Sequence, residues 1–259
     1  MEYEDGEAYD QDTQGPYYDL WFEMLEHFLD LYLPEDGKLL DAGGGTAEFT
    51  VRAANLRKRL TCVNLDISQS MLEQAERKIR EHELQTRIKN ELGDIQHIQY
   101  PDESFDYVMC LGDAISFCTD VDKAFTELVR VTKPMGQIHV SVNSFWGNYF
   151  AMYKHDSDLE VSFDDVRKYM ETRIIYINGQ SSGCRSFTLQ ELLGWAKTHR
   201  LKVVAKFAAP IFPFSDDWMA EDSIASEIRA LQYEYCDKEN IMEFGNHLNV
   251  IYRKEITPA

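Results

Sequence analysis

A run of three glycines offers the clearest ligand-binding chemistry in this sequence. In the stretch LLDAGGGTAEF, Gly43, Gly44 and Gly45 follow Asp41 and precede helix-forming residues. Glycine lacks a Cβ, so the loop can turn tightly and a ligand can come close to its backbone, while the following helix presents free N–H groups. Glu48 stands where a dinucleotide motif needs its third glycine, and the Gly-Lys-Ser/Thr of a P-loop is missing, so neither dinucleotide nor triphosphate binding is favoured.

Two aspartates follow the next two apolar stretches. Asp66 ends LTCVNLD, and Asp94 comes directly after Gly93. A carboxylate at the tip of a second parallel strand can accept hydrogen bonds from both ribose hydroxyls of an adenosine, and one after the third strand can take the adenine amino group. Either aspartate alone is equally typical of a turn or a cap. Their order after the glycines favours an adenosine site without phosphates.

The elements that must position these residues alternate between strand and helix. Apolar residues recur at helical spacing over 17–33 before Pro34, and further helices are predicted at 47–55, from Ser68, from Thr119 with a capping box to Asp122, and from Thr188. Strands are predicted at 38–43, 60–66, 87–94, 105–111, 136–144, 201–208 and 244–254. This alternation predicts an open parallel sheet covered by helices.

The alternation is interrupted late in the chain. Residues 145–187 and 210–243 show no clean period, and we expect them to be insertions that form a cap for the substrate. Residues 1–14 hold six acidic residues and no basic one, which is typical of a mobile acidic arm. We therefore predict a single domain over 15–259, preceded by that arm.

The composition limits the partners. Asp and Glu outnumber Lys and Arg by 45 to 26, for a net charge of −19, so nucleic acid is an unlikely partner. No apolar run is long enough to span a membrane, and the first residues have neither the basic region nor the apolar run of a secretory signal. The five cysteines are scattered without a C-x-x-C pair, so we expect free thiols in the cytoplasm and no metal site.

Four stretches together resemble a known family. LLDAGGGTAEF, NLDISQSMLEQAERK, LGDIQHIQYPDESFDYVMCLGDAISF and KAFTELVRVTKPMGQIHVSVNS look like successive motifs of the class I S-adenosylmethionine-dependent methyltransferases, in the small-molecule, type 11-like branch. The resemblance covers about residues 17–144. It implies a Rossmann-like α/β fold, with a seven-stranded, mostly parallel sheet, helices on both faces and an antiparallel last strand.

The resemblance also implies roles for particular residues. Asp41, Gly43 and Gly45 match the loop whose backbone lies against the methionine portion of the cofactor, whereas Gly44 has no role of its own because the family tolerates other small residues there. The family usually has a third glycine where this chain has Ala47, and we expect alanine, as a good helix former, to preserve the packing. The positions implied to contact S-adenosylmethionine or its product S-adenosylhomocysteine are Tyr18, Asp41, Gly43, Gly44, Gly45, Asp66, Ile67, Met71, Gly93, Asp94, Ile95, Leu111 and Gly112.

The acceptor side is less defined, because the cofactor carries the activated methyl group and a general base is not obligatory. Aromatic residues near the strand ends could box an acceptor, and an arginine could hold a carboxylate. We expect substrate contacts at Trp21, Trp146, Tyr149 and Arg185, and the weak catalytic candidates are His155, Tyr149 and Asn143. For each of them, packing or pairing with a neighbouring acid is the alternative.

We therefore predict a methyltransferase that moves a methyl group to N or O of a small molecule by in-line displacement, as a monomer or homodimer. The alternatives are a tRNA or protein methyltransferase, a spermidine-synthase-like transferase, and a cofactor-binding protein without catalysis.

Overall fold

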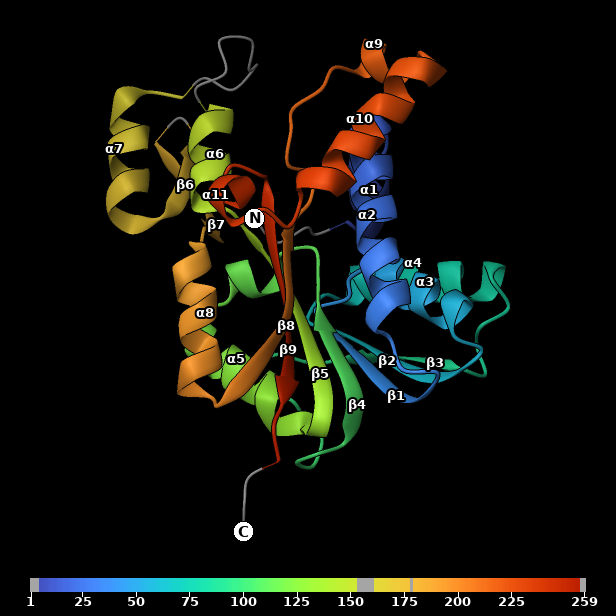
Figure 1. The fold of residues 1–259 in the computed structure, drawn as a ribbon. Coiled ribbons are helices and arrows are strands. Elements are labelled where there is room, and N and C mark those ends of the chain that lie inside the picture. The colour runs from blue at the N-terminus through green and yellow to red at the C-terminus, as the bar shows by residue number, and fades with distance from the viewer. Residues whose placement is uncertain (1–4, 153–160, 178, 257–259) are drawn as a thin grey trace.

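The computed structural model describes residues 5–152, 161–177 and 179–256. Within them a seven-stranded sheet has the order β3-β2-β1-β4-β5-β9-β8 (Figure 1). Its strands are β1 (Asp36–Ala42), β2 (Arg59–Asp66), β3 (Ile88–Leu92), β4 (Phe105–Cys110), β5 (Thr132–Asn143), β8 (Leu201–Ala208) and β9 (His247–Lys254). β1 to β5 pair in parallel, and β9 is antiparallel to β5 and β8. The predicted Rossmann-like sheet with its antiparallel last strand is confirmed.

Helices cover both faces of this sheet, because its strands are apolar on both sides. Leu39 packs with the buried residues of the helices on one face, and the next residue, Leu40, packs with those on the opposite face. The first face carries α2 (Pro16–Tyr32), α3 (Glu48–Leu56) and α4 (Gln69–Glu81), and the second carries η1 (Ala114–Phe117), α5 (Val121–Val131) and α8 (Leu189–Thr198).

Side-chain N-caps mark the first residues of several helices. The predicted capping box of Thr188 and Glu191 is present at α8, and Ser68 caps α4 by accepting from the Met71 amide. The capping box predicted at Thr119 is wrong. Asp120 caps α5 instead, because its carboxylate accepts from the Lys123 amide, while the Thr119 hydroxyl donates to Gln96.

The segment for which the sequence predicts a mobile arm contains a docked helix, α1 (Gly6–Asp12). The Gly6 amide donates to Ser70 Oγ at 2.8 Å, and a Cβ on Gly6 would lie 2.9 Å from the Ser70 carbonyl oxygen. The Asp10 carboxylate accepts from Thr46 Oγ1 at 2.6 Å and Lys78 Nζ at 3.2 Å. Opposite charge and a close backbone approach therefore hold these acidic residues against α4.

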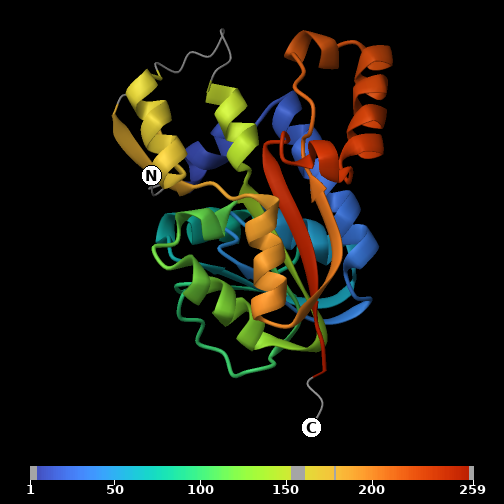
Figure 2. The ribbon, with the colours of Figure 1, turned by 60° about the vertical axis from the view of Figure 1, so that its left-hand side comes forward.

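Both predicted insertions stand above the edge of the sheet at which the parallel strands end (Figures 1 and 2). The first contains α6 (Phe145–Met152), α7 (Phe163–Thr172) and a two-stranded sheet of β6 (Ile174–Ile177) and β7 (Gln180–Arg185). The second contains α9 (Asp216–Met219), α10 (Asp222–Tyr235) and α11 (Glu239–Met242). Among the described residues, no helix combines the length and the apolar character needed to cross a bilayer.

Candidate functional site

The predicted cofactor motifs meet at the carboxyl ends of β1, β2 and β3. The amides of Gly43 and Gly44 both donate to the Leu65 carbonyl, at 2.7 and 3.2 Å. The Gly93 amide donates to the carbonyl of Asp66 at 2.9 Å. The loops after β1 and β3 are thus both hydrogen-bonded to the end of β2, and three motifs far apart in sequence form one continuous edge.

Gly45 and Gly44 of the glycine loop are required for two different structural reasons. Gly45 has a φ of +54°, and no described atom lies within 4 Å of the position that a Cβ would occupy, so the backbone there is open to a ligand. At Gly44, a Cβ would lie 2.1 Å from Asn64 Oδ1 and 2.7 Å from Asp41 Cγ. Gly44, to which the sequence gives no role of its own, is therefore the glycine with the least room.

Ala47 lies at the start of α3 in the left-handed region, with φ +65° and ψ +24°, and its side chain is fully buried. The residue is the N-cap and not a helical residue, so the expected benefit of alanine as a helix former does not apply. Left-handed backbone favours glycine, which gives the physical reason for a glycine at this position in the family.

Asp66 is oriented by backbone amides. Its Oδ2 accepts from the Gly45 amide at 2.9 Å, and its Oδ1 accepts from the Ser68 amide at 2.8 Å. Burial raises the pKa of the Asp66 carboxyl, and these amide hydrogen bonds partly oppose that rise. Each oxygen has a second lone pair, so the fixed carboxylate can accept further hydrogen bonds from a ligand.

The end of β3 offers a carboxylate beside apolar surface. Asp94 accepts from the Gln96 amide at 2.8 Å; partial burial raises its pKa, but the hydrogen bonds from Gln96 outweigh this and lower it overall. Ile95 is buried, whereas Ile67, after β2, exposes 64% of its surface. An exposed isoleucine next to two acidic strand ends is suited to contact the flat face of a base.

Asp41 carries a buried acceptor without a partner. Its Oδ2 accepts from Thr50 Oγ1 at 2.6 Å, while its Oδ1 has no hydrogen-bond partner among the described residues. Burial, followed by the nearby charge of Asp66, raises the pKa of this carboxyl to about 7. Below about pH 7 this buried carboxyl therefore favours its protonated, uncharged form.

A second polar cluster lies after β4, and the sequence analysis missed it. Asp113 Oδ2 is 2.6 Å from His247 Nδ1, and His247 Nε2 is 3.1 Å from the Tyr17 hydroxyl. Ser141 Oγ donates to Asp113 Oδ1 at 3.1 Å, and Asn246 Nδ2 donates to the Tyr17 hydroxyl at 2.8 Å. One signal was available: the triplet Leu-Gly-Asp occurs after β3 and again after β4, at 111–113.

The two predicted helical aromatics lie beside this cluster. Trp21 is 3% exposed, and its ring stacks on the His247 ring with centroids 4.9 Å apart. Tyr18 is half-buried and contacts the Trp21 ring edge-on. A Cβ on Gly112 would lie 3.9 Å from Tyr9 Oη and 4.0 Å from Trp21. α1 and α2 therefore both reach the end of β4, where Leu111 and Gly112 were predicted to approach the cofactor.

The other predicted acceptor residues lie at the end of β5 or in the first insertion and mostly have structural partners. Asn143 Nδ2 donates to Cys184 Sγ at 2.9 Å, and Asn143 Oδ1 accepts from Asn148. Arg185 pairs with Glu191 at 3.1 Å, as the alternative interpretation expected. Trp146 and Tyr149 pack with the ring cluster of α6, and Met71 is buried on α4. His155 lies outside the described residues.

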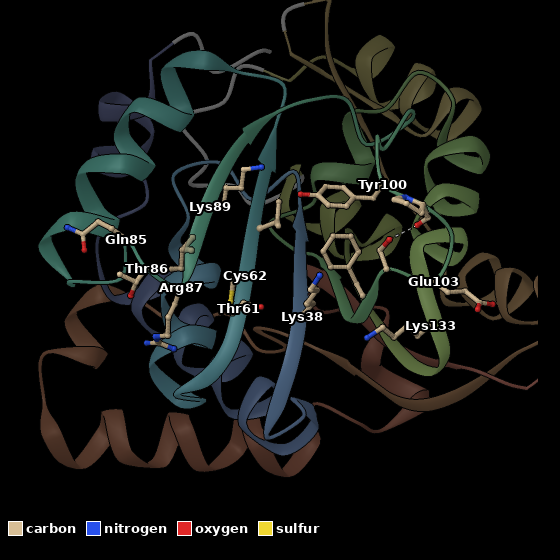
Figure 3. A pocket seen from close by; sticks show the side chains of 15 residues that line it. Lys38, Thr61, Cys62, Gln85, Thr86, Arg87, Lys89, Tyr100, Glu103 and Lys133 are labelled. Atoms are coloured by element: carbon tan, nitrogen blue, oxygen red, sulfur yellow. Dashed lines mark hydrogen bonds between the residues drawn. The ribbon is translucent and has the colours of Figure 1, made fainter.

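A hollow of 640 Å³ lies away from this edge (Figure 3). It is lined by the amino-terminal halves of β1 to β4, because the connection 93–104 between β3 and β4 contains no helix to cover that face. Three of its four cations have partners: Lys133 pairs with Asp106 at 2.8 Å, Lys89 pairs with Glu91, and Arg87 donates to the Ala54 carbonyl. The hollow is therefore neither at the ligand-binding end of the strands nor a free basic groove.

The comparisons with known proteins agree with this geometry. Residues 40–140 match the family described as a methyltransferase domain. The demethylmenaquinone methyltransferase of Lactobacillus johnsonii is 30% identical over 141 residues, which are 51% of this chain and 57% of that protein. The chain thus spans about half the length of this curated relative.

Two solved structures share the fold at low sequence identity. The PH0226 protein of Pyrococcus horikoshii OT3 has a TM-score of 0.66 and 18% identity, with 94% of each chain covered. The geranyl diphosphate C-methyltransferase of Streptomyces coelicolor A3(2), solved with S-adenosyl-L-homocysteine, has a TM-score of 0.59 and 14% identity, covering 90% of this chain and 76% of that one.

Proposed function

We propose that this chain, whose residues 40–140 match a family described as a methyltransferase domain, is an S-adenosylmethionine-dependent methyltransferase that transfers a methyl group to a small-molecule acceptor. The observation that carries the proposal is the continuous edge formed by the glycine loop, Asp66 and Asp94 at three neighbouring strand ends. The relatives named as methyltransferases support the same reaction type.

The residues at this edge fit an adenosyl cofactor. The open backbone at Gly45 leaves room for a ligand, and the fixed carboxylate of Asp66 has lone pairs for ribose hydroxyls. Asp94 and the exposed Ile67 would hold the adenine edge and face. When bound, S-adenosylmethionine supplies a methyl group already activated on a positively charged sulfur.

The chain's own contribution is then to align the acceptor and exclude water. α1 and α2 reach the end of β4 through Tyr9 and Trp21, and both insertions stand above the same edge (Figure 2). This arrangement favours an acceptor small enough to be enclosed. We propose N or O as the methylated atom, and include acidic carbon because one structural relative is named a C-methyltransferase.

The alternative acceptors have less support. A tRNA would need a basic groove, whereas the net charge is −19 and two of the four cations that line the hollow in Figure 3 are paired with carboxylates. A spermidine-synthase-like transferase would use the same edge but would add an aminopropyl group and not a methyl group. A non-catalytic protein would bind the cofactor and modify nothing.

Two measurements test the proposal. Calorimetry with S-adenosylmethionine and S-adenosylhomocysteine should show micromolar or tighter binding, and no binding at millimolar ligand would contradict the cofactor site. Incubation of the protein and S-adenosylmethionine with a deproteinised metabolite extract should then give a compound heavier by one methylene group. A mass gain confined to tRNA or peptide controls would instead favour the macromolecular alternatives.

A further inference from the structure

Four elements bring a histidine, a carboxylate and a phenol into one chain of hydrogen bonds. Asp113 follows β4, His247 opens β9, Tyr17 belongs to the first turn of α2, and Ser141 of β5 supports the carboxylate. Asp113 is only 5% exposed. A buried carboxylate needs partners. Ser141 bonds one oxygen of Asp113, and His247 links the other oxygen to the Tyr17 hydroxyl.

The partners of each atom fix where the protons lie. Asp113 Oδ2 only accepts, so His247 Nδ1 carries a proton and donates it. His247 Nε2 is then the acceptor in the neutral ring, and the Tyr17 hydroxyl donates to it. Asn246 donates to the Tyr17 oxygen, which leaves that oxygen one further lone pair for a donor from outside the cluster.

The cluster borders the end of β4 at which the reaction is proposed. Asp113 is the next residue after Gly112, and Trp21, which stacks on His247, also reaches Gly112. The Trp21 Nε1 donor is buried and has no partner among the described residues. The polar chain and the unpaired indole donor thus lie at the same strand end.

We propose that Tyr17, His247 and Asp113 form a proton relay that removes the proton of the methyl acceptor. This inference rests on the proposed function. An oxygen or nitrogen acceptor uses a lone pair, and a carbon acceptor uses the electron pair left by its departing proton, to form the new bond to the methyl carbon, while the carbon–sulfur bond breaks with its electron pair left on sulfur. The acceptor's proton passes to the Tyr17 oxygen, while the Tyr17 proton passes to His247 Nε2.

The resulting imidazolium is stabilised by the adjacent Asp113 carboxylate, so the step leaves an ion pair and no isolated charge. The other titratable groups that face the cluster are Tyr18 of α2, Cys110 of β4 and Cys184 of β7. Each of them is neutral when protonated, and burial raises the pKa of both cysteines, so no competing base lies among these three.

The relay defines a class of acceptor. A substrate with an O–H, N–H or acidic C–H group has a proton that must leave during methyl transfer. A thiolate or a tertiary amine has none to lose and would gain nothing from the relay. We therefore assign the site to acceptors that are protonated at neutral pH.

The test compares two reactions of the same full-length protein. The first is transfer of labelled methyl from S-adenosylmethionine to a deproteinised metabolite extract. The second is methylation of S-adenosylhomocysteine by iodomethane, in which the sulfur lone pair attacks carbon, iodide leaves with the bonding pair, and no proton moves. The variants are Tyr17→Phe, His247→Gln and Asp113→Asn, and His27→Gln, elsewhere on α2, is the matched control.

For Tyr17→Phe and His247→Gln we expect extract methylation at neutral pH to fall by about 10²- to 10⁴-fold. Asp113→Asn, which acts through His247, should lower it by at least about tenfold. The iodomethane reaction and the affinity for S-adenosylhomocysteine should stay close to wild type. The loss in His247→Gln should shrink as pH rises, because hydroxide then replaces the missing base.

Three results would overturn the relay: unchanged extract methylation in Tyr17→Phe, an equal fall of both reactions in all variants, or a loss in His247→Gln that does not depend on pH. Tyr17→Phe retains the ring packing, so it decides the question if His247→Gln does not fold. A wild-type protein that fails to bind S-adenosylhomocysteine would instead overturn the proposed function itself, and the relay with it.

Discussion

The Gly45 amide lies 2.9 Å from Asp66 Oδ2 and donates a hydrogen bond to it. The Asp66 carboxylate at the end of β2 therefore holds the glycine loop that follows β1. Its remaining lone pairs can accept hydrogen bonds from a ligand bound at the ends of these two strands. This shared role makes Asp66 the residue whose replacement tests the cofactor site most directly.

Asp66→Ala should weaken binding of S-adenosylmethionine and S-adenosylhomocysteine by about 1–3 kcal/mol, because ribose loses an acceptor and the loop loses its tie. Calorimetry measures both affinities, with the exposed Asp217→Ala of α9 as the control. An affinity equal to wild type would refute the assignment of Asp66 to the ribose.

Gly44→Ala should destabilise the fold by about 1–3 kcal/mol and impair cofactor binding, because a Cβ would meet Asn64 Oδ1 at 2.1 Å. Gly194 in α8 offers a matched control, since a Cβ there meets no described atom within 4 Å. Gly194→Ala should leave stability unchanged or raise it by up to about 1 kcal/mol. Urea unfolding compares the two, and a Gly44→Ala protein as stable as wild type would contradict the packing described for the loop.

Ala47→Gly should change the free energy of unfolding by less than about 1 kcal/mol, because its effects oppose one another. Glycine adopts the left-handed backbone without strain, which stabilises the folded state. It also removes a buried methyl group and makes the unfolded chain more flexible, and both changes are destabilising. Ala47→Val should cost more than about 2 kcal/mol, because a β-branched residue tolerates this conformation poorly. Denaturant unfolding of both variants gives the comparison, and a harmless valine would argue against the observed backbone at this position.

Asp41 should make stability fall as pH rises. Burial raises its pKa in the folded state from 3.8 to about 7, so the folded protein keeps a proton that the unfolded chain has released. This stabilising contribution is complete below the unfolded pKa and is lost as pH rises through about 7, with a slope of up to about 1.4 kcal/mol per pH unit between the two values.

Asp41→Asn should therefore gain stability relative to wild type between about pH 4 and about pH 8. Asp106→Asn serves as a control without a pH trend in this range: partial burial raises the pKa of Asp106, but its hydrogen bonds and its ion pair with Lys133 lower that pKa overall, so its contribution is lost only as pH falls below the ordinary value of 3.8. Urea unfolding across this range separates the two, and parallel pH curves for wild type and Asp41→Asn would show that Asp41 ionises normally.

The alternation of strands and helices and the parallel core were predictable from sequence because they depend on local patterns, whereas the antiparallel last strand was implied by the family resemblance. Apolar runs that end in glycine or aspartate mark where parallel strands stop, and Asp66 and Asp94 follow at the expected places. Even so, Gly44 was misjudged, since its requirement comes from Asn64 on the neighbouring strand and not from its own loop.

The proton relay and the docking of α1 could not be read from local patterns. Tyr17 and His247 are separated by 230 positions and meet only because β9 inserts between β5 and β8. The acidic composition of α1 predicts a solvated arm, because Lys78 and Thr46, the partners that hold Asp10, are distant from it in sequence. The acceptor residues of the first insertion belong to a small aromatic cluster with its own packing, which gives no periodic signal.

The position of α1 has a kinetic consequence. It is hydrogen-bonded to α4 and to Thr46 beside the glycine loop, and its Tyr9 reaches the end of β4. We therefore predict that movement of this helix limits the exchange of product for fresh cofactor. Part of the fastening is the ion pair of Asp10 with Lys78, which salt weakens. Dissociation of S-adenosylhomocysteine should accordingly accelerate with ionic strength, and the N-terminal turn would then set the pace of successive catalytic cycles.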